Sequence, residues 1–394
     1  DFLSGNLVPY QWLSIEDSIL AEDLLSLNNL REDDLPVVIM EDGQILKDPE
    51  LRDIAEKTGR NINAREELYD VAIIGAGPAG LAAGVYGGSE GLKTLLIEKR
   101  APGGQAGTSS RIENYLGFPK GLSGAELSRR AITQATRFGI EFLSPVEVKG
   151  LKTEGHYKII ELDNGNEIKT KSLIITTGVS YRKLHAPGLE DLTGAGVYYG
   201  AATTEANSCK DKSVFVVGGG NSAGQGAMYL SKFANEVNIL IRREDLSNSM
   251  SHYLIDQIKE TPNIRLRPYS QIKSAIGQEH LEALEIENVK TGEVSNENAG
   301  SLFIFIGAKP ITDWIDGKII TNEKGFIETG RDLAKQKSYR KIWKLQREPY
   351  LLETCIPGIF AAGDVRAGAM NRVASAVGEG AMSIKLVHQY LDEI

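Results

Sequence analysis

Hydrophobic and polar positions follow one pattern over most of the chain. From residue 66 onward, short apolar runs of strand length alternate with longer segments whose apolar residues recur at helical spacing. Such alternation is typical of βαβ units, in which helices connect neighbouring parallel strands. The pattern therefore predicts an α/β fold with parallel sheets.

The first 65 residues follow a different pattern. Their predicted elements are an extended stretch, a helix, a strand and, after a turn and a second strand, a closing helix, over residues 7–14, 15–29, 35–40 and 48–59. This β-α-β-β-α order resembles the later part of a thioredoxin or glutaredoxin fold, with Pro36 where such folds place a cis-proline. The alternative is an ordinary α+β unit with a turn proline. The unit contains no cysteine, so docking or dimerisation is its expected role.

Length, charge and hydropathy narrow the class of protein. At about 150 residues per domain, 394 residues correspond to two or three domains. Lys and Arg number 44 against 53 Asp and Glu, a net charge of −9, which disfavours nucleic acid or an anionic membrane as partner. The longest apolar runs are broken by glycine and fall far short of the roughly 18 residues of a membrane helix. We therefore expect a soluble protein.

The chain contains two cysteines, Cys209 and Cys355, far apart in sequence. Two such residues build neither a disulfide framework nor a zinc cluster, so we expect no metal site and a reducing, cytoplasmic location. No signal-peptide pattern opens the chain. Because it begins at Asp1 rather than Met, we interpret it as a trimmed or processed product.

A glycine-rich turn follows the strand YDVAIIG and precedes a helical segment. It has the pattern G-x-G-x-x-G, over Gly75, Ala76, Gly77, Pro78, Ala79 and Gly80. In this context the first glycine permits a tight turn, the second lets the backbone approach a pyrophosphate, and the third lets helix and strand pack closely. Glu98 ends the next strand, where an acid accepts hydrogen bonds from ribose hydroxyls. Together these features predict a dinucleotide site.

A second candidate segment, IPGIFAAGDV, places Gly363 and Asp364 directly after an apolar strand. Small residues at a strand end let a ligand approach the backbone, and Asp364 would accept a hydrogen bond from a hydroxyl. The alternative is an aspartate that caps the next helix. Its occurrence together with the first glycine turn favours the ligand-binding interpretation.

A second glycine turn, in SVFVVGGGNSAG, has Gly218, Gly220 and Ala223 at the three positions, and alanine is tolerated at the third. A second dinucleotide is therefore expected. The next strand ends in Arg242 and Arg243 rather than an acid, which suits a 2′-phosphate and favours NADPH over NADH. The alternative is a solvated arginine pair.

Seven stretches between Tyr69 and Ile394 resemble, in sequence and in order, the low-molecular-weight thioredoxin reductase family of flavoproteins: GAGPAG, APGGQ, IENYLGFP, TTG, GGGNSA, FIFIG and PGIFAAGDV. The resemblance covers over three-quarters of the chain. It implies a homodimer and two Rossmann-type domains. The FAD domain is expected over residues 66–181 and 300–394, and an inserted NAD(P)H-binding domain over 182–299.

The resemblance also implies individual contacts. FAD would be held by Gly75, Gly77, Pro78, Ala79, Gly80, Glu98, Gly104, Gln105, Asn114, Thr177, Gly178, Gly363, Asp364, Arg372, Val373 and Ala374. The second dinucleotide, NADPH, would be held by Gly218, Gly220, Asn221, Ser222, Ala223, Arg242 and Arg243. Val373 replaces a family glutamine, which matters little if the backbone does the binding.

The main departure concerns the family's Cys-x-x-Cys-Asp, which follows a Gly-Val-x-x stretch. Here that stretch is GVYY, residues 196–199, and residues 200–205 read GAATTE. A dithiol is needed to pass electrons to a disulfide through a mixed disulfide, and Cys209 offers no resolving partner. We therefore expect no thioredoxin reduction by the usual route. Tyr198 and Tyr199 are expected either to shield the flavin or to pack in a core.

Two further departures affect possible partners. Ile241 and Ser247 replace a histidine and an arginine of the family pattern, which would weaken NADPH binding or mean that the pocket has changed its ligand. Gln225 likewise replaces a family glutamate. Residues 331–349, RDLAKQKSYRKIWKLQREP, look like an insertion with seven Lys or Arg and Trp343 in the middle. It is expected either to be a solvated loop or to dock on an acidic carrier such as a ferredoxin or on an internal acidic surface.

These observations favour an NAD(P)H-dependent flavin oxidoreductase whose electrons leave to a non-disulfide acceptor, such as a quinone, a ferredoxin or oxygen. No side chain is expected to be catalytic, because the flavin performs the redox step. The alternative is a flavin-binding redox sensor or regulatory module with little turnover, behind an upstream signalling domain. In a third interpretation, the second site binds another FAD or nothing and a protein donor such as ferredoxin supplies electrons.

Overall fold

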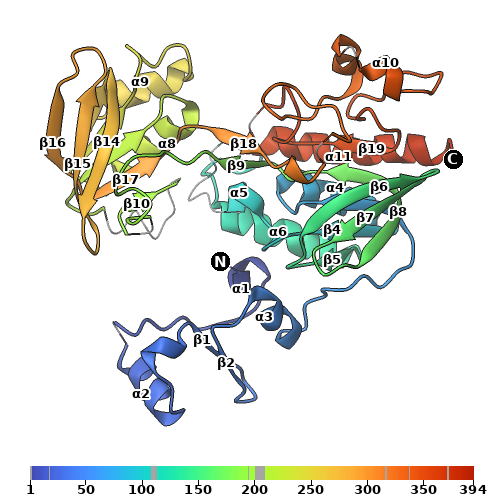
Figure 1. Ribbon diagram of the computed structural model, residues 1–394, viewed down its shortest axis with the longest axis horizontal. Coiled ribbons are helices and arrows are strands. Elements are labelled where there is room, and N and C mark those ends of the chain that lie inside the picture. The colour runs from blue at the N-terminus through green and yellow to red at the C-terminus, as the bar shows by residue number, and fades with distance from the viewer. Residues whose placement is uncertain are drawn as a thin grey trace. The chain divides into compact units, whose positions relative to one another are not determined.

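The computed structural model describes residues 2–16, 18–107, 112, 114–193, 195–199, 209–315, 317–336, 338–370 and 372–394. The stretch 200–205, where the family has its cysteines, therefore lies outside the described residues. The chain forms two compact units (Figure 1), Asp1–Gly178 with Pro310–Ile394, and Val179–Lys309.

A seven-stranded sheet forms the centre of the first unit. Its parallel strands run in the order β5-β4-β3-β8, β19 pairs in parallel with β8, and β7 and β6 continue antiparallel from β8. Their bounds are Tyr69–Ile74 for β3, Thr94–Ile97 for β4, Glu141–Leu143 for β5, Val148–Glu154 for β6, Tyr157–Leu162 for β7, Glu167–Ile175 for β8 and Ile359–Ala361 for β19. Every residue of β4 and of β19 is buried, as expected of strands covered on both faces.

The helices of this sheet are α4 (Pro78–Ser89), α5 (Gly104–Gly107), α6 (Gly124–Arg137) and α11 (Val373–Leu391). The hydroxyl of Ser123 caps α6 by accepting a hydrogen bond from the Glu126 N–H at 3.1 Å. Helices α4 and α11 cross so closely that a Cβ on Gly380 would collide with the Ala79 carbonyl oxygen. This crossing brings the first turn of α4 next to the C-terminal segment.

Two apolar cores pack against this sheet, one of them including Ile97, Ile175 and Cys355 and the other Leu96, Ile174 and Val387. Between strands β18 (Ala308–Pro310) and β19, the chain forms η2 (Asp313–Ile315), η3 (Gly330–Lys335) and α10 (Tyr339–Ile342). Among the described residues, no helix is both long and apolar enough to cross a membrane.

The second unit contains a five-stranded parallel sheet in the order β10-β17-β11-β12-β13 and a three-stranded antiparallel sheet in the order β14-β15-β16. The bounds are Val197–Tyr198 for β10, Ser213–Val217 for β11, Glu236–Leu240 for β12, Ile264–Arg267 for β13, Ser270–Gly277 for β14, Leu281–Asn288 for β15, Val294–Asn298 for β16 and Ser301–Ile304 for β17. Helices α8 (Asn221–Leu230) and α9 (His252–Glu260) follow β11 and β12. Where the chain passes between units, β9 (Val179–Tyr181) pairs with β18 (Ala308–Pro310). The parallel strands of the two units confirm the predicted Rossmann-type pair.

The N-terminal residues contain the predicted helix, two strands and closing helix but not the predicted first strand. They form α1 (Phe2–Gly5), α2 (Ile19–Leu27), η1 (Glu32–Asp34), β1 (Val37–Ile39), β2 (Ile45–Lys47) and α3 (Leu51–Lys57). The strand predicted over 7–14 is wrong: it has no ladder partner among the described residues, and Trp12 is 78% exposed. The Leu35–Pro36 peptide is cis, but β1 pairs only with β2 within the described chain. A thioredoxin-like unit is therefore not shown.

Candidate functional site

The first glycine turn has the geometry of an anion site. Gly75 has φ +102°, and a Cβ there would lie 2.5 Å from the Thr176 carbonyl oxygen. Helix α4 begins at Pro78 with Gly77 as its cap, and no side chain fills the cap. A Cβ on Gly77 would have its nearest neighbour, the Gly104 Cα, 4.0 Å away. The amides of the first turn are therefore open to a negatively charged ligand.

Glu98 is tied to the same turn. Its carboxylate oxygens accept hydrogen bonds from the Ala76 N–H at 2.8 Å and the Arg100 N–H at 3.0 Å. Burial raises the pKa of the Glu98 carboxyl, against the lowering effect of these hydrogen bonds. Glu98 thus lies where the sequence placed a ribose acceptor, and it also fixes the glycine turn, which the sequence did not indicate.

The APGGQ loop lies against the first glycine turn. The Gly103 N–H donates to the Ala76 carbonyl at 2.7 Å, and a Cβ on Gly104 would come within 2.9 Å of the Gly77 Cα. Gly104 and Gln105 form the start of α5, and Gln105 is exposed. Asn114 is also exposed and has no hydrogen bond among the described residues. The structure therefore brings Gly104 against the first glycine turn.

The end of β8 completes the opposite side of the turn. The Thr176 hydroxyl donates to the Gly75 carbonyl at 2.7 Å, and the Thr177 hydroxyl donates to the Ile311 carbonyl at 2.8 Å. Gly178 follows with φ +65°. These hydroxyls are therefore used to fasten neighbouring segments, which leaves the backbone of the TTG stretch as the part that could meet a cofactor.

Asp364 is the clearest unpaired group of the site. Its half-buried carboxylate accepts no hydrogen bond from any residue that the structure describes. Burial raises its pKa, and the negative charge of Glu379 adds to this effect. Burying a carboxylate without a donor is costly, so the site fits a ligand that brings hydroxyl groups.

Glu379 organises this segment and was missed by the sequence reasoning. It accepts the Gly363 N–H at 2.8 Å and forms two hydrogen bonds with the Arg366 guanidinium, at 3.1 and 2.5 Å. Arg366 and Glu379 lie 13 positions apart, and both are largely buried. No sequence signal marked this pair. Its effect is to hold the loop that carries Asp364 against α11.

The N-terminus of α11 is the last part of the first site. Arg372 is its cap residue, without a side-chain cap hydrogen bond, and Val373 and Ala374 begin the helix. The first helical N–H groups have no intrahelical partner in any α-helix. Because α11 crosses α4 at Gly380, these amides belong to the same unit as the first glycine turn.

The second glycine turn has the same local geometry in the other unit. Gly218 has φ +137° and abuts the Phe305 carbonyl, and α8 begins at Asn221 with Gly220 as an uncapped N-cap. Ala223 is buried and Ser222 is exposed. The amides at the start of α8 are therefore also open to a negatively charged ligand.

Asn221 is partly committed to internal contacts. Its side-chain oxygen accepts the Ser251 N–H at 2.8 Å and the Ser251 hydroxyl at 2.9 Å. The Ser249 hydroxyl donates to the Gly219 carbonyl at 2.7 Å. The sequence reasoning missed both serines, which lie about 30 positions from the turn. They attach the turn to the start of α9.

The arginine pair lies at the carboxyl end of β12, beside β11 in the parallel sheet. Arg242 and Arg243 are exposed, and neither side chain has a hydrogen bond or ion pair among the described residues. Ser247, the position of a family arginine, instead donates to Asp245 at 2.6 Å. Two free cations thus remain near the second glycine turn.

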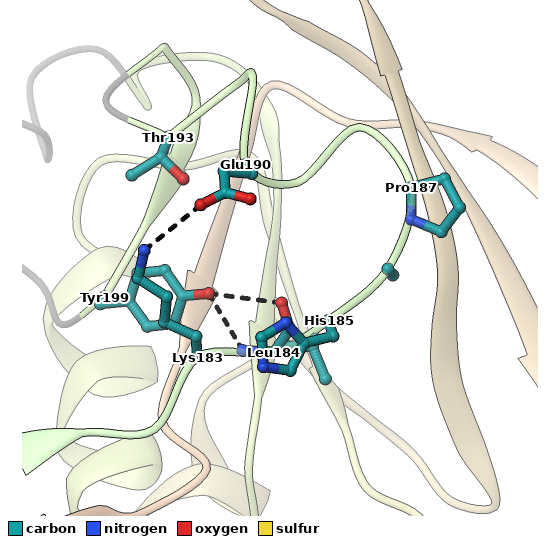
Figure 2. A pocket seen from close by; sticks show the side chains of 8 residues that line it. Lys183, Leu184, His185, Pro187, Glu190, Thr193 and Tyr199 are labelled. Carbon is teal, nitrogen blue, oxygen red and sulfur yellow. Dashed lines mark hydrogen bonds and ion pairs between the residues drawn. The ribbon is translucent and has the colours of Figure 1, made fainter.

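The segment before the undescribed residues 200–208 forms a cavity of about 360 Å³. Figure 2 shows its lining: Lys183, Leu184, His185, Ala186, Pro187, Glu190, Thr193 and Tyr199. The Tyr199 hydroxyl accepts the Leu184 N–H at 3.0 Å, and Tyr198 stacks on Phe303 with ring centroids 5.2 Å apart. These contacts support the packing interpretation of both tyrosines.

Both cysteines are buried, each in the core of a different unit. Cys209 packs in the core around β11 and α8. Cys355 packs in a core of the first unit, where its sulfur accepts the Ile320 N–H at 3.3 Å and burial raises the thiol pKa. A buried thiol with a raised pKa is a poor nucleophile.

The basic insertion is anchored at its C-terminal half. Trp343 is buried, and its indole N–H donates to the Arg347 carbonyl at 2.7 Å. The Arg347 guanidinium binds the buried Glu353 carboxylate at 2.7 and 3.0 Å, and Glu393 at 2.9 Å. Arg347 therefore binds an internal acidic surface, which is one of the roles expected for the insertion, and its side chain is not part of a solvated loop.

The comparisons with known proteins agree with this geometry. A family model described as pyridine nucleotide-disulphide oxidoreductase matches residues 69–380. The chain belongs to this family. The thioredoxin reductase of Peptoclostridium acidaminophilum is 34% identical over 333 residues, which are 83% of this chain and 98% of the relative. That of Bacillus subtilis strain 168 is 33% identical over 342 residues, 84% and 97% of the two chains.

The solved structures of the family show the same fold. The thioredoxin reductase of Lactococcus lactis, in its FR conformation, has a TM-score of 0.72 at 33% identity, with 83% of this chain and 100% of that chain covered. The T. acidophilum enzyme has a TM-score of 0.71 at 28% identity, with 83% and 99% covered. Thioredoxin reductases use FAD and NADPH. The open helix starts and the unpaired Asp364 fit these groups.

Proposed function

We propose that the protein is an FAD-dependent oxidoreductase that takes electrons from NADPH and delivers them to an acceptor other than a disulfide. One observation carries the proposal: the chain has a thioredoxin reductase body but only two cysteines, each buried in a different unit. Disulfide reduction requires an accessible thiolate and a partner thiol. The family's usual reaction therefore lacks its protein groups here.

The first unit is proposed to hold FAD, with residues 66–181 and 300–394 as its domain. Gly75, Gly77 and the amides of α4 would meet the pyrophosphate, and Glu98 the adenosine ribose. The ribityl hydroxyls would supply the hydrogen bonds that the Asp364 carboxylate lacks. The start of α11 would direct amides at the ring. When bound, a flavin accepts a hydride and releases electrons singly or in pairs.

The second unit is proposed to hold NADPH, with residues 182–299 as its domain. The amides at the start of α8 would meet the pyrophosphate, and the unpaired Arg242 and Arg243 would bind the 2′-phosphate through charge-assisted hydrogen bonds. No side chain is assigned a proton transfer. The chain's residues bind and orient the cofactors. A homodimer, as in the resembling family, is part of the proposal.

A steady-state assay tests the proposal. FAD-loaded protein should oxidise NADPH with ferricyanide or a benzoquinone as acceptor, and oxidised thioredoxin should not raise the rate. Replacing Arg242→Ala and Arg243→Ala should raise the KM for NADPH about tenfold or more and leave the KM for NADH nearly unchanged. Thioredoxin-dependent turnover, or equal effects on both nucleotides, would contradict the proposal.

A second candidate function is a flavin-binding redox sensor or regulatory module with little turnover, or a flavoprotein fed by a protein donor such as ferredoxin. The observation that favours it is Ser247, bonded to Asp245 where the family pattern has an arginine. Tight FAD binding with negligible NADPH oxidation, and reduction by a ferredoxin system, would identify it.

A further inference from the structure

The charge of the chain is unevenly distributed. Residues 1–50 contain 12 Asp or Glu against 2 Lys or Arg, a net charge of −10, whereas the whole chain has −9. Residues 331–349 contain seven Lys or Arg against two acidic residues, a net charge of +5. A strongly acidic segment and a strongly basic one therefore occur in one molecule.

The acidic segment presents an uncovered apolar face. In α2, Ile19 and Leu27 are each 79% exposed, and Leu20 lies beside Ile19 and is also exposed. Asp23 lies between Ile19 and Leu27 at helical spacing and shares their face. We call this surface the α2 face and include Glu16 and Glu22, which are exposed. Apolar side chains rimmed by charge mark interaction surfaces.

The basic segment presents a matching surface. Arg340, Lys341 and Lys344 are exposed, and none has an ion pair among the described residues. Ile342 lies between Lys341 and Lys344 and Leu345 follows Lys344, and these two side chains are 41% and 43% exposed. We call these five residues the basic arm.

The basic arm is held in place rather than loose. Trp343 lies in sequence between Ile342 and Lys344 of the basic arm and is buried. Tyr339 stacks on Trp343 with ring centroids 6.2 Å apart. Arg347 is fixed by Glu353 and Glu393 and lies over the rings of Trp343 and Tyr350, 5.3 and 4.0 Å from their centroids. A fixed surface loses less conformational entropy on binding.

We propose that the basic arm of one copy of this chain docks on the α2 face of a second copy. Three cations and two apolar side chains on the arm meet three carboxylates and three apolar side chains on the face. Charge complementarity selects this occupant over an acidic one, which Glu16, Glu22 and Asp23 would repel. Within one chain, the described residues show no hydrogen bond or ion pair between the two surfaces.

Charge reversal tests the contact without changing either cofactor site. The arm variant is Arg340→Glu, Lys341→Glu and Lys344→Glu, and the face variant is Glu16→Lys, Glu22→Lys and Asp23→Lys. A control of equal charge change to the arm variant is Lys232→Glu, Lys259→Glu and Lys273→Glu in the second unit, where all three lysines are exposed. Circular dichroism checks that each variant folds.

Sedimentation velocity measures the self-association of each variant. A dimer formed through another surface should not respond to these substitutions. The wild type should show a salt-sensitive association that each variant weakens about tenfold or more, while the control retains it. A chain with both reversals, or a mixture of the two variants, should regain it. In a mixture of ¹⁴N- and ¹⁵N-labelled protein, carbodiimide should cross-link Lys341 or Lys344 of one copy to Glu22 or Asp23 of another. Failure of the double reversal to restore association, an equal loss in the control, or cross-links within one copy only would overturn the proposal.

Discussion

At the residue scale, the candidate site combines glycines that a tight turn requires with charged side chains held by partners far along the chain. Gly75 and Gly218 were predicted because a tight turn with positive φ restricts the residue type. Glu379 was not, because its partners Arg366 and Gly363 are 13 and 16 positions away and only the packing of α11 brings them together. A single sequence carries no signal for such a contact.

The Glu379 carboxylate is a positioning group for Asp364, which gives a first prediction. Glu379→Gln should weaken FAD binding to the apoprotein by about tenfold, because the Gly363–Asp364 loop loses a charge-assisted anchor. Removing the negative charge should also lower the pKa of Asp364. Flavin fluorescence quenching measures the affinity. Lys385→Gln, at an exposed site on the same helix, is the control, and equal affinities in both variants would refute the role.

Lys158 is a buried cation outside both cofactor sites. Its ammonium donates to the His156 and Lys171 carbonyls at 2.9 and 2.8 Å and to the Tyr390 hydroxyl at 2.7 Å. Burial lowers its pKa from 10.5 to about 7. Between about pH 7 and pH 10.5, Lys158 is therefore protonated in the unfolded chain and deprotonated in the folded protein.

Stability should therefore rise with pH across that interval. The contribution of Lys158 to the free energy of unfolding should be independent of pH below about pH 7 and should increase between about pH 7 and 10. Lys158→Met should lack this rise, whereas Lys169→Met, which changes an exposed lysine on β8, should keep it. Urea unfolding at several pH values measures the difference. Parallel pH profiles for wild type and Lys158→Met would contradict the lowered pKa.

At the element scale, hydrophobic periodicity identified the buried parallel strands correctly and failed where no partner strand exists. β3 and β11 were expected as apolar runs before helices and β4 as the strand after the first of these helices, and the sheets contain all three. The stretch 7–14 has comparable apolar content but forms no ladder, because the described chain offers it no strand to pair with. Strand formation depends on such tertiary partners, which a pattern within one segment does not report.

The crossing of α4 and α11 allows a matched pair of substitutions. Gly380→Ala should lower the free energy of unfolding by about 1–3 kcal/mol, because its Cβ would collide with the Ala79 carbonyl. Gly378→Ala, in the same helix with nothing within 4 Å of its Cβ, should raise it by about 0.5–1 kcal/mol. Chemical denaturation compares the two. A stabilised Gly380→Ala variant would show that the helices do not cross as described.

At the scale of the whole molecule, the family body and its cofactors could be predicted from the sequence, and the electron acceptor could not. The two glycine turns and the seven motifs occur along the chain in the same order as in the family, and this order indicates the two-domain fold. An acceptor is recognised by surface shape and charge, which depend on how distant segments assemble. The basic arm illustrates this point, since its anchoring by Trp343 and Arg347 was visible only in the structure.

The central claim is that electrons enter from NADPH and leave the flavin directly for an external acceptor, because the two cysteines, each buried in a different unit, are not expected to form a redox-active dithiol. An anaerobic titration of FAD-loaded protein with NADPH, following the visible flavin band, tests it most directly. One NADPH per FAD should bleach the band completely, and subsequent dithionite should find no further electron-accepting group. A band that NADPH leaves intact and dithionite bleaches would contradict NADPH as the donor, and uptake of a second electron pair per FAD would reveal a redox-active disulfide.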